Sequence, residues 1–231
     1  MAKLILIRHG QSTWNAANIF TGWVDVPLSK KGRNEAVLAA EKLKNYVIDV
    51  CFTSLLIRAI ETAVICLTEY EEVCAGRSPV IKHAADDPEW HGWDKYEGDP
   101  TQELPIFTSQ ALDERYYGKL QGLNKTQTAE KYGAEVVMEW RRSFSGHPPG
   151  GESLEDTMKR TLPFFRDRIL THLKHGDTVL VAAHGNSLRS IIMELDHLPP
   201  EAVPGLELAT GMPIVYDVDE QGNISNKQIL L

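Results

Sequence analysis

Two short apolar runs, each followed at once by a histidine and a glycine, constrain the fold of this chain most. Lys3–Ile7 leads into Arg8-His9-Gly10, and Thr178–Ala183 leads into His184-Gly185. A continuous apolar run that ends in a loop is typical of a strand buried on both faces, as in a parallel sheet covered by helices. Because ligands of such sheets bind beyond the carboxyl ends of the strands, we expect both imidazoles to face one pocket.

Other stretches alternate between strand and helix patterns. Apolar runs predict further strands over 47–53, 79–84, 214–218 and 224–230. Capping residues and helical spacing predict helices that begin after Ser29, Ser54 and Ser153, and others over 134–144 and 187–195. Pro163 lies inside one of these helices and should kink or split it. The alternation implies an α/β fold: a single three-layer domain over residues 1–231, with a mainly parallel sheet flanked by helices.

The stretch from about 74 to 110 departs from this alternation. It holds several prolines, two tryptophans and many acidic residues but little periodicity, so we expect an extended loop insertion there. Within it, the run 88–93 (PEWHGW) suggests an interface patch or an ornament rather than a lid.

Composition excludes several classes of protein. The chain has 231 residues, 42% of them hydrophobic, and a net charge of −8, which argues for a globular protein and against binding to nucleic acid or to an anionic membrane surface. No apolar stretch approaches the ~20 residues of a membrane span. We therefore expect a cytoplasmic protein, in which the three cysteines are reduced structural thiols.

Specific motifs add to these patterns. Leu6–Ser12 (LIRHGQS) resembles the signature of the histidine phosphatase superfamily. Longer runs resemble the cofactor-dependent phosphoglycerate mutase family, at residues 8–28, 53–62, 112–133, 139–142 and 183–189. The resemblance implies a phosphoglycerate-mutase-like fold that interconverts 3-phosphoglycerate and 2-phosphoglycerate through a phosphohistidine, with 2,3-bisphosphoglycerate as primer and no metal. A homodimer and a homotetramer both stay open.

The resemblance also implies roles for the reactive side chains. His9 matches the nucleophile, and neutral imidazole is nucleophilic near physiological pH. Arg8 and Arg58 match arginines that clamp phosphate, which suits the guanidinium fork. His184 matches a donor to the transferring group, and Glu114 matches the carboxylate that moves the proton of the substrate hydroxyl.

Eleven further residues match substrate-binding positions of the family: Ser12, Asn15, Thr21, Gly22, Arg115, Tyr117, Lys125, Arg141, Arg142, Gly185 and Asn186. A bisphosphoglycerate carries about −4 to −5 near pH 7, counting about −1.5 to −2 for each phosphate and one carboxylate. Because the chain itself is net negative, we expect its cations to gather locally around the ligand.

Alternatives from other classes remain. A phosphatase of the same superfamily would use water as the acceptor instead of a substrate hydroxyl. A catalytically inactive binding module is disfavoured, since Arg8, His9, Arg58, Glu114 and His184 are all present. One departure from the family is Gln11, which stands where glutamate is more usual and should alter local hydrogen bonding.

Overall fold

The computed structural model describes residues 1–82 and 98–231. Its sheet has the strand order β3-β4-β2-β5-β1-β6-β7. The strands are β1 (Ala2–Arg8), β2 (Val50–Thr53), β3 (Ser78–Lys82), β4 (Glu103–Thr108), β5 (Thr178–Ala183), β6 (Pro213–Val218) and β7 (Ile224–Ile229). Neighbours from β3 to β1 pair in parallel, whereas β6 and β7 add antiparallel ladders at one edge. The predicted three-layer architecture with a mainly parallel sheet is confirmed.

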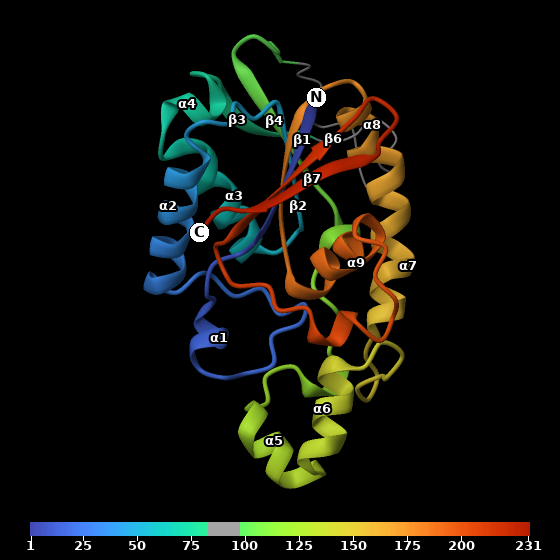
Figure 1. Ribbon diagram of the computed structural model, residues 1–231. Helices are drawn as coiled ribbons and strands as arrows, with labels where there is room; N and C mark the ends of the chain where they lie inside the picture. Colours follow the sequence, from blue (N-terminus) through green and yellow to red (C-terminus); the bar gives the residue numbers. More distant parts are fainter. Residues whose placement is uncertain (83–97) are drawn as a thin grey trace.

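Helices cover both faces of the sheet (Figure 1). One face carries α2 (Lys30–Leu43), α3 (Ile57–Thr68) and α4 (Glu71–Cys74). The other carries α7 (Leu154–Phe164), a π-helical segment (Phe165–Ile169), α8 (Leu170–Lys174) and α9 (Gly185–Leu195). The short α1 (Thr13–Ala16), α5 (Lys125–Tyr132) and α6 (Ala134–Arg142) lie beyond one end of the sheet.

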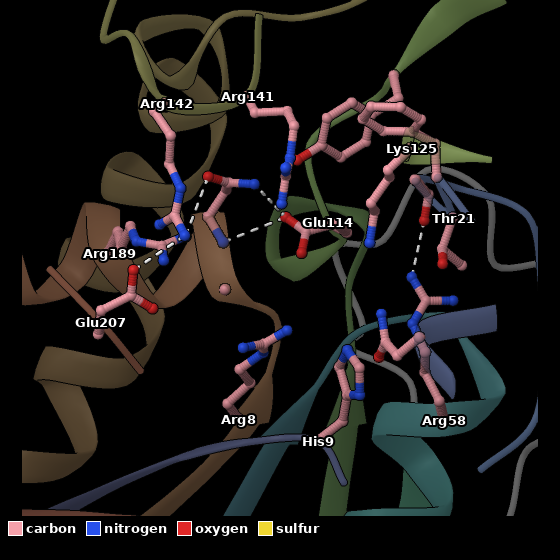
Figure 2. Close-up of a pocket in the computed structure, with 16 residues that line it drawn as sticks. Arg8, His9, Thr21, Arg58, Glu114, Lys125, Arg141, Arg142, Arg189 and Glu207 are labelled. Carbon is pink, nitrogen blue, oxygen red and sulfur yellow. Dashed lines mark hydrogen bonds and ion pairs between the residues drawn. The ribbon is translucent and has the colours of Figure 1, made fainter. Parts of the chain in front are cut away.

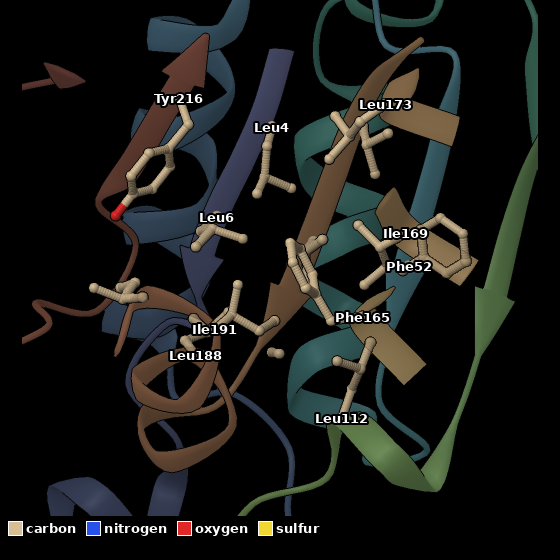
Figure 3. Packing of buried hydrophobic residues seen from close by; sticks show 14 of the residues in the cluster. Leu4, Leu6, Phe52, Leu112, Phe165, Ile169, Leu173, Leu188, Ile191 and Tyr216 are labelled. Carbon is tan, nitrogen blue, oxygen red and sulfur yellow. The ribbon is translucent and has the colours of Figure 1, made fainter. Parts of the chain in front are cut away.

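Strand β1 shows why its apolar run has no polar face. Leu4 and Leu6 pack into the cluster under α7 to α9, which Figure 3 shows from close by. Ile5 and Ile7 point the other way, into the cluster under α2 and α3. Alternate side chains of a strand face opposite sides of the sheet, so both sets must be apolar when both sides are covered. All three cysteines, Cys51, Cys66 and Cys74, lie in the second cluster, where they are buried and free.

The helix starts test the capping predictions. The Ser29 side chain accepts the Gly32 N–H at the start of α2, and Ser153 forms a reciprocal capping box with Asp156 at the start of α7. The prediction for Ser54 is wrong. Helix α3 begins at Ile57 without a side-chain cap, and Leu55, which directly follows Ser54, is 51% exposed and outside the helix.

Pro163 splits its helix as predicted. Helix α7 ends at Phe164, and the π-helical segment separates it from α8. Proline has no N–H to donate and its ring presses on the preceding turn, so the hydrogen-bond ladder must change near it.

The stretch from 74 to 110 is more regular than expected in its described part. It holds β3, which we predicted, and β4, which we did not. Pro105 argues against a strand, because proline cannot donate to a ladder, yet β4 pairs on both sides, with β2 and with β3. The run 88–93 lies outside the described residues.

The sheet positions the candidate site. In the parallel ladders, Arg8 at the end of β1 pairs with Ala183 at the end of β5, and Thr53 at the end of β2 pairs with Ala182. The residues that follow these strands therefore lie close together at the carboxyl ends of the strands, on the side where α5 and α6 lie (Figure 1). Among the described residues, no helix combines the length and the apolar character needed to cross a membrane.

Candidate active site

His9 and His184 lie side by side at the carboxyl ends of β1 and β5. Their ring centroids are 4.9 Å apart in an edge-to-face arrangement. His9 Nδ1 lies 2.7 Å from the Gly10 carbonyl oxygen, which can only accept, so Nδ1 carries the proton. The Nε2 atom of a neutral His9 is then left with a free lone pair, as a nucleophile needs.

A glycine pair fixes the loop that carries His9. A Cβ atom on Gly10 would lie 2.2 Å from the Gly32 carbonyl oxygen, and one on Gly32 would lie 2.1 Å from the Gln11 carbonyl oxygen. The first turn of α2 therefore contacts the loop backbone to backbone. Gln11 adds to this contact, because its side-chain oxygen accepts a hydrogen bond from the Ser29 hydroxyl at 2.9 Å.

Ser54 is a partner of His184 that sequence reasoning missed. The Ser54 hydroxyl lies 2.7 Å from His184 Nε2, and both residues are fully buried. The signal was present, since Ser54 follows the end of β2 as His9 and His184 follow the ends of β1 and β5. We had interpreted it as a helix cap.

Burial keeps both imidazoles neutral. It is the main cause that holds the pKa of His9 well below its usual range, and His184, Arg58 and Arg8 lower this pKa further. Burial likewise lowers the pKa of His184, followed by Arg58 and Arg8. Since desolvation and nearby cations both disfavour imidazolium, His9 is in its nucleophilic form at neutral pH.

Two arginines flank His9. The Arg58 guanidinium donates to the carbonyl oxygens of Gly22 at 2.7 Å and Val24 at 3.0 Å, and burial lowers its pKa to about 10. Arg8 donates from Nη1 to the Leu208 carbonyl oxygen at 2.8 Å. Its buried Nε has no hydrogen-bond partner in the described part of the chain. A buried donor without a partner fits a site that receives an anion.

Glu114 is held as a carboxylate. It accepts hydrogen bonds from the Arg115 N–H at 2.8 Å and from the Asn186 side-chain amide at 2.8 Å. Burial alone would raise the pKa of Glu114, but these two donors, with Arg8 and Arg58, bring it below its usual range. An ionised, buried carboxylate can accept a proton from a hydroxyl brought against it.

The pocket above His9 has a volume of about 120 Å³. Thirteen of the predicted residues line it: Arg8, His9, Asn15, Thr21, Gly22, Arg58, Glu114, Tyr117, Lys125, Arg141, Arg142, Gly185 and Asn186. Figure 2 shows Arg8 and His9 at one end of the pocket, with Lys125, Arg141 and Arg142 across from them. Residues from β1, α3, α5, α6 and α9 thus converge on one space.

Three predicted residues do not line this pocket. Ser12 is buried and caps α1 by accepting the Asn15 N–H at 3.0 Å. Arg115 is fully buried behind the wall, where it donates to the Arg141 carbonyl oxygen at 2.8 Å and to the Tyr117 hydroxyl at 3.2 Å. His184 lies beside His9 and is fully buried.

Three lining residues were not predicted: Phe20, Arg189 and Glu207. Arg189 could have been found, because it lies four residues after Gly185 on α9 and so faces the same side of the helix. Glu207 belongs to the loop before β6, and nothing in its sequence neighbourhood marks it.

Positive charge dominates the lining. Among the described residues that line the pocket, there are two carboxylates, Glu114 and Glu207, and six cations: Arg8, Arg58, Lys125, Arg141, Arg142 and Arg189. Within the described residues, no group of histidine, cysteine, aspartate and glutamate side chains could hold a metal ion. The arrangement suits a small ligand with several negative charges.

Comparisons with known proteins agree with this fold. A family model described as "Histidine phosphatase superfamily (branch 1)" matches residues 4–79 and 98–227. The chain belongs to this superfamily. A solved structure titled "Mycobacterial hydrolase 1" shares the fold, with a TM-score of 0.74 and 22% identity over 100% of this chain and 98% of that one.

Sequence relatives narrow the assignment. A "2,3-bisphosphoglycerate-dependent phosphoglycerate mutase" of Gloeothece citriformis is 70% identical over the whole of both chains. A "2,3-bisphosphoglycerate-dependent phosphoglycerate mutase 1" of Gloeobacter violaceus is 65% identical over 100% of this chain and 99% of its own. Within the superfamily, the chain therefore belongs to the 2,3-bisphosphoglycerate-dependent phosphoglycerate mutases.

Proposed function

We propose that this protein interconverts 3-phosphoglycerate and 2-phosphoglycerate in the cytoplasm, with His9 as the phosphoryl carrier. One observation carries the proposal: the free Nε2 of His9 faces a pocket whose far side holds Lys125, Arg141 and Arg142. A ligand can therefore place one phosphoryl group at His9 while its other anionic groups are held by these cations. The names of the close relatives support the same reaction.

The residues at the inner end of the pocket would stabilise the transfer. Arg8 and Arg58 lie on either side of His9 in Figure 2 and offer guanidinium donors where negative charge builds up on the transferring group. His184, neutral and in contact with His9, adds a further donor. Fixed donors in a buried site need no reorganisation during the reaction.

Glu114 would handle the proton of the substrate. As phospho-His9 passes its phosphoryl group to a substrate hydroxyl, the P–N bond breaks, a P–O bond forms, and the hydroxyl proton moves to the Glu114 carboxylate. In the return step, His9 Nε2 attacks the other phosphoryl group, and Glu114 gives the proton back to the oxygen that is released. The two half-reactions balance, so the protein ends as phospho-His9.

The cofactor 2,3-bisphosphoglycerate fits the same residues. Its chemistry is to supply the first phosphoryl group to His9. The buried Arg8 Nε that lacks a protein partner, and the cations opposite His9, match a ligand with an anionic group at each end.

The second candidate is a phosphatase of the same superfamily, in which water accepts the phosphoryl group from His9. The Lys125, Arg141 and Arg142 cluster favours the mutase, because water as acceptor needs no cations at a distance from His9. The two reactions differ in whether the free phosphate or the isomer accumulates.

Parallel assays decide between them. With 3-phosphoglycerate as substrate, we expect 2-phosphoglycerate to form faster than free phosphate, and catalytic amounts of 2,3-bisphosphoglycerate to raise the isomerisation rate. Exhaustive treatment with EDTA should leave this rate unchanged, since arginines supply the charge stabilisation that metals give elsewhere. Phosphate as the main product would support the phosphatase and contradict the mutase.

A further inference from the structure

Three consecutive residues of one loop each hold a different arginine of the pocket. The Leu206 carbonyl oxygen accepts from Arg189 Nε at 2.8 Å, and the Leu208 carbonyl oxygen accepts from Arg8 Nη1 at 2.8 Å. Between them, a Glu207 carboxylate oxygen lies 2.9 Å from Arg142 Nη2. We call residues 206–208 the arginine-binding segment; it lies between a 3-10 turn (Val203–Gly205) and β6.

The middle contact differs from the other two in charge. Carbonyl oxygens orient Arg189 and Arg8 without cancelling their positive charge. Glu207 brings a full negative charge to Arg142, in the pocket where the substrate must present its own anionic groups. Any ligand group that binds Arg142 closely must therefore compete with a carboxylate that belongs to the protein.

Glu207 is also unlike Glu114, the other carboxylate of the pocket. Glu114 is buried and fixed by N–H donors. The Glu207 side chain is 73% exposed, and that of Arg142 is 31% exposed. Figure 2 shows Glu207 beside Arg142 and Arg189, at the side of the pocket away from Lys125 and Thr21. A side chain this exposed can leave its partner at little cost, but its charge stays near the pocket.

The negative charge of Glu207 should repel a more highly charged ligand more strongly. Each phosphate contributes about −1.5 to −2 at neutral pH and a carboxylate −1, so monophosphoglycerate carries about −2.5 to −3 and bisphosphoglycerate about −4 to −5. Repulsion from a negative charge near the pocket grows with the charge of the ligand. Glu207 should therefore weaken the binding of the bisphosphate more than that of the monophosphate.

We propose that Glu207 is a specificity-determining residue, which occupies Arg142 and lowers the affinity of the site for bisphosphoglycerate relative to monophosphoglycerate. This inference rests on the proposed function. The ratio of the affinities for the two ligands would then depend on one exposed side chain that takes no part in the reaction.

The test measures binding of both ligands to chains that cannot turn them over. In a His9→Ala background, the dissociation constants of 2,3-bisphosphoglycerate and 3-phosphoglycerate are measured by calorimetry at low ionic strength, with and without Glu207→Gln. Glutamine keeps the shape and removes the charge. We expect the constant for the bisphosphate to fall about fivefold and that for the monophosphate about twofold, with both changes shrinking in high salt.

A matched control separates the local effect from net charge. Glu201 is exposed in the same connection between α9 and β6 but does not line the pocket, so Glu201→Gln should change both constants by less than about twofold and their ratio much less than Glu207→Gln does. If Glu207→Gln weakened both ligands, Glu207 would be orienting Arg142 for substrate and the inference would be overturned. An unchanged ratio of the two constants would overturn it as well. If neither ligand bound to the chain with Glu207 intact, the proposed function itself would fail, and this inference with it.

Discussion

The inner end of the pocket and its far side differ in the elements that form them and in how deeply their side chains are buried. At the inner end, Arg8 ends the buried strand β1, His9 follows it and Arg58 lies on α3; His9 and Arg58 are 3% and 1% exposed. The far side, with Lys125, Arg141 and Arg142, belongs to α5 and α6, which lie beyond the sheet, and its side chains are half-buried. Chemistry at His9 needs a dry, fixed environment, whereas capture of a charged ligand needs cations that face the solvent. Changes at the two ends should therefore damage different steps.

Removing the proposed nucleophile should give the largest effect. His9→Ala should lower isomerisation by about four orders of magnitude or more, because it removes the proposed carrier of the phosphoryl group. After brief incubation with labelled 2,3-bisphosphoglycerate, the unaltered protein should hold an acid-labile, base-stable label, as a phosphoramidate does. His9→Ala should hold none. His184→Ala is the control, and we expect it to keep a label even where turnover is slow; a label that persists in His9→Ala would refute the assignment.

Changes on the far side should be smaller and of another kind. Replacing Arg141 and Arg142 by alanine leaves Arg8, His9, Arg58 and Glu114 in place, so phosphorylation of His9 should remain possible. Isomerisation should fall about 100-fold, consistent with the loss of about 3 kcal/mol of charge-assisted contacts, and the share of turnover that ends as free phosphate should rise. Assays of 2-phosphoglycerate and of phosphate measure both. An unchanged ratio of the two products would show that this pair does not select the acceptor.

The smallest predicted effect concerns stability in acid. His9 and His184 have lowered pKa values in the folded protein, so below about pH 6.5 the unfolded chain binds protons that the folded protein does not. Each histidine should then reduce the free energy of unfolding by about 1.4 kcal/mol per pH unit as pH falls, down to its folded pKa.

Asp113 has the opposite effect on the free energy of unfolding as pH falls. Burial raises its pKa to about 6, so between about pH 6 and 4 the folded protein takes up a proton there first and gains stability. Denaturant unfolding between pH 7 and 5 should therefore show a shallower loss for His184→Asn than for the unaltered protein, and a steeper loss for Asp113→Asn. Equal slopes in all three would contradict the burial of these groups as the cause.

Strands and helices with a clear apolar pattern could be predicted, and those without one could not. The runs that form β1 and β5 are apolar throughout because helices cover both faces of the sheet. From this pattern, His9 and His184 could be placed together at the carboxyl ends of two parallel strands. The strand β4 was missed because Pro105 argues against a paired strand, and α5 because Lys125–Tyr132 has only one buried residue, Thr128, and thus no apolar stripe.

The site shows the same division. The catalytic group could be proposed from motifs, whereas Ser54 and Glu207 act through contacts between segments far apart in the chain, at separations of 130 and 65 residues from His184 and Arg142 respectively. Arg115 is the reverse case. Its motif predicts a contact with the ligand, but Arg115 is fully buried and does not line the pocket; it donates to the backbone carbonyl oxygen of Arg141.

The contact between Gly10 and Gly32 ties the position of His9 to a whole helix. Because their backbones touch with no side chain between them, the loop that carries His9 and the first turn of α2 cannot shift against each other without collision. We therefore expect a movement of α2 toward the loop to displace His9 as well. Substitutions at the solvent-exposed face of α2, far from the pocket, should therefore affect phosphoryl transfer by changing the position of His9.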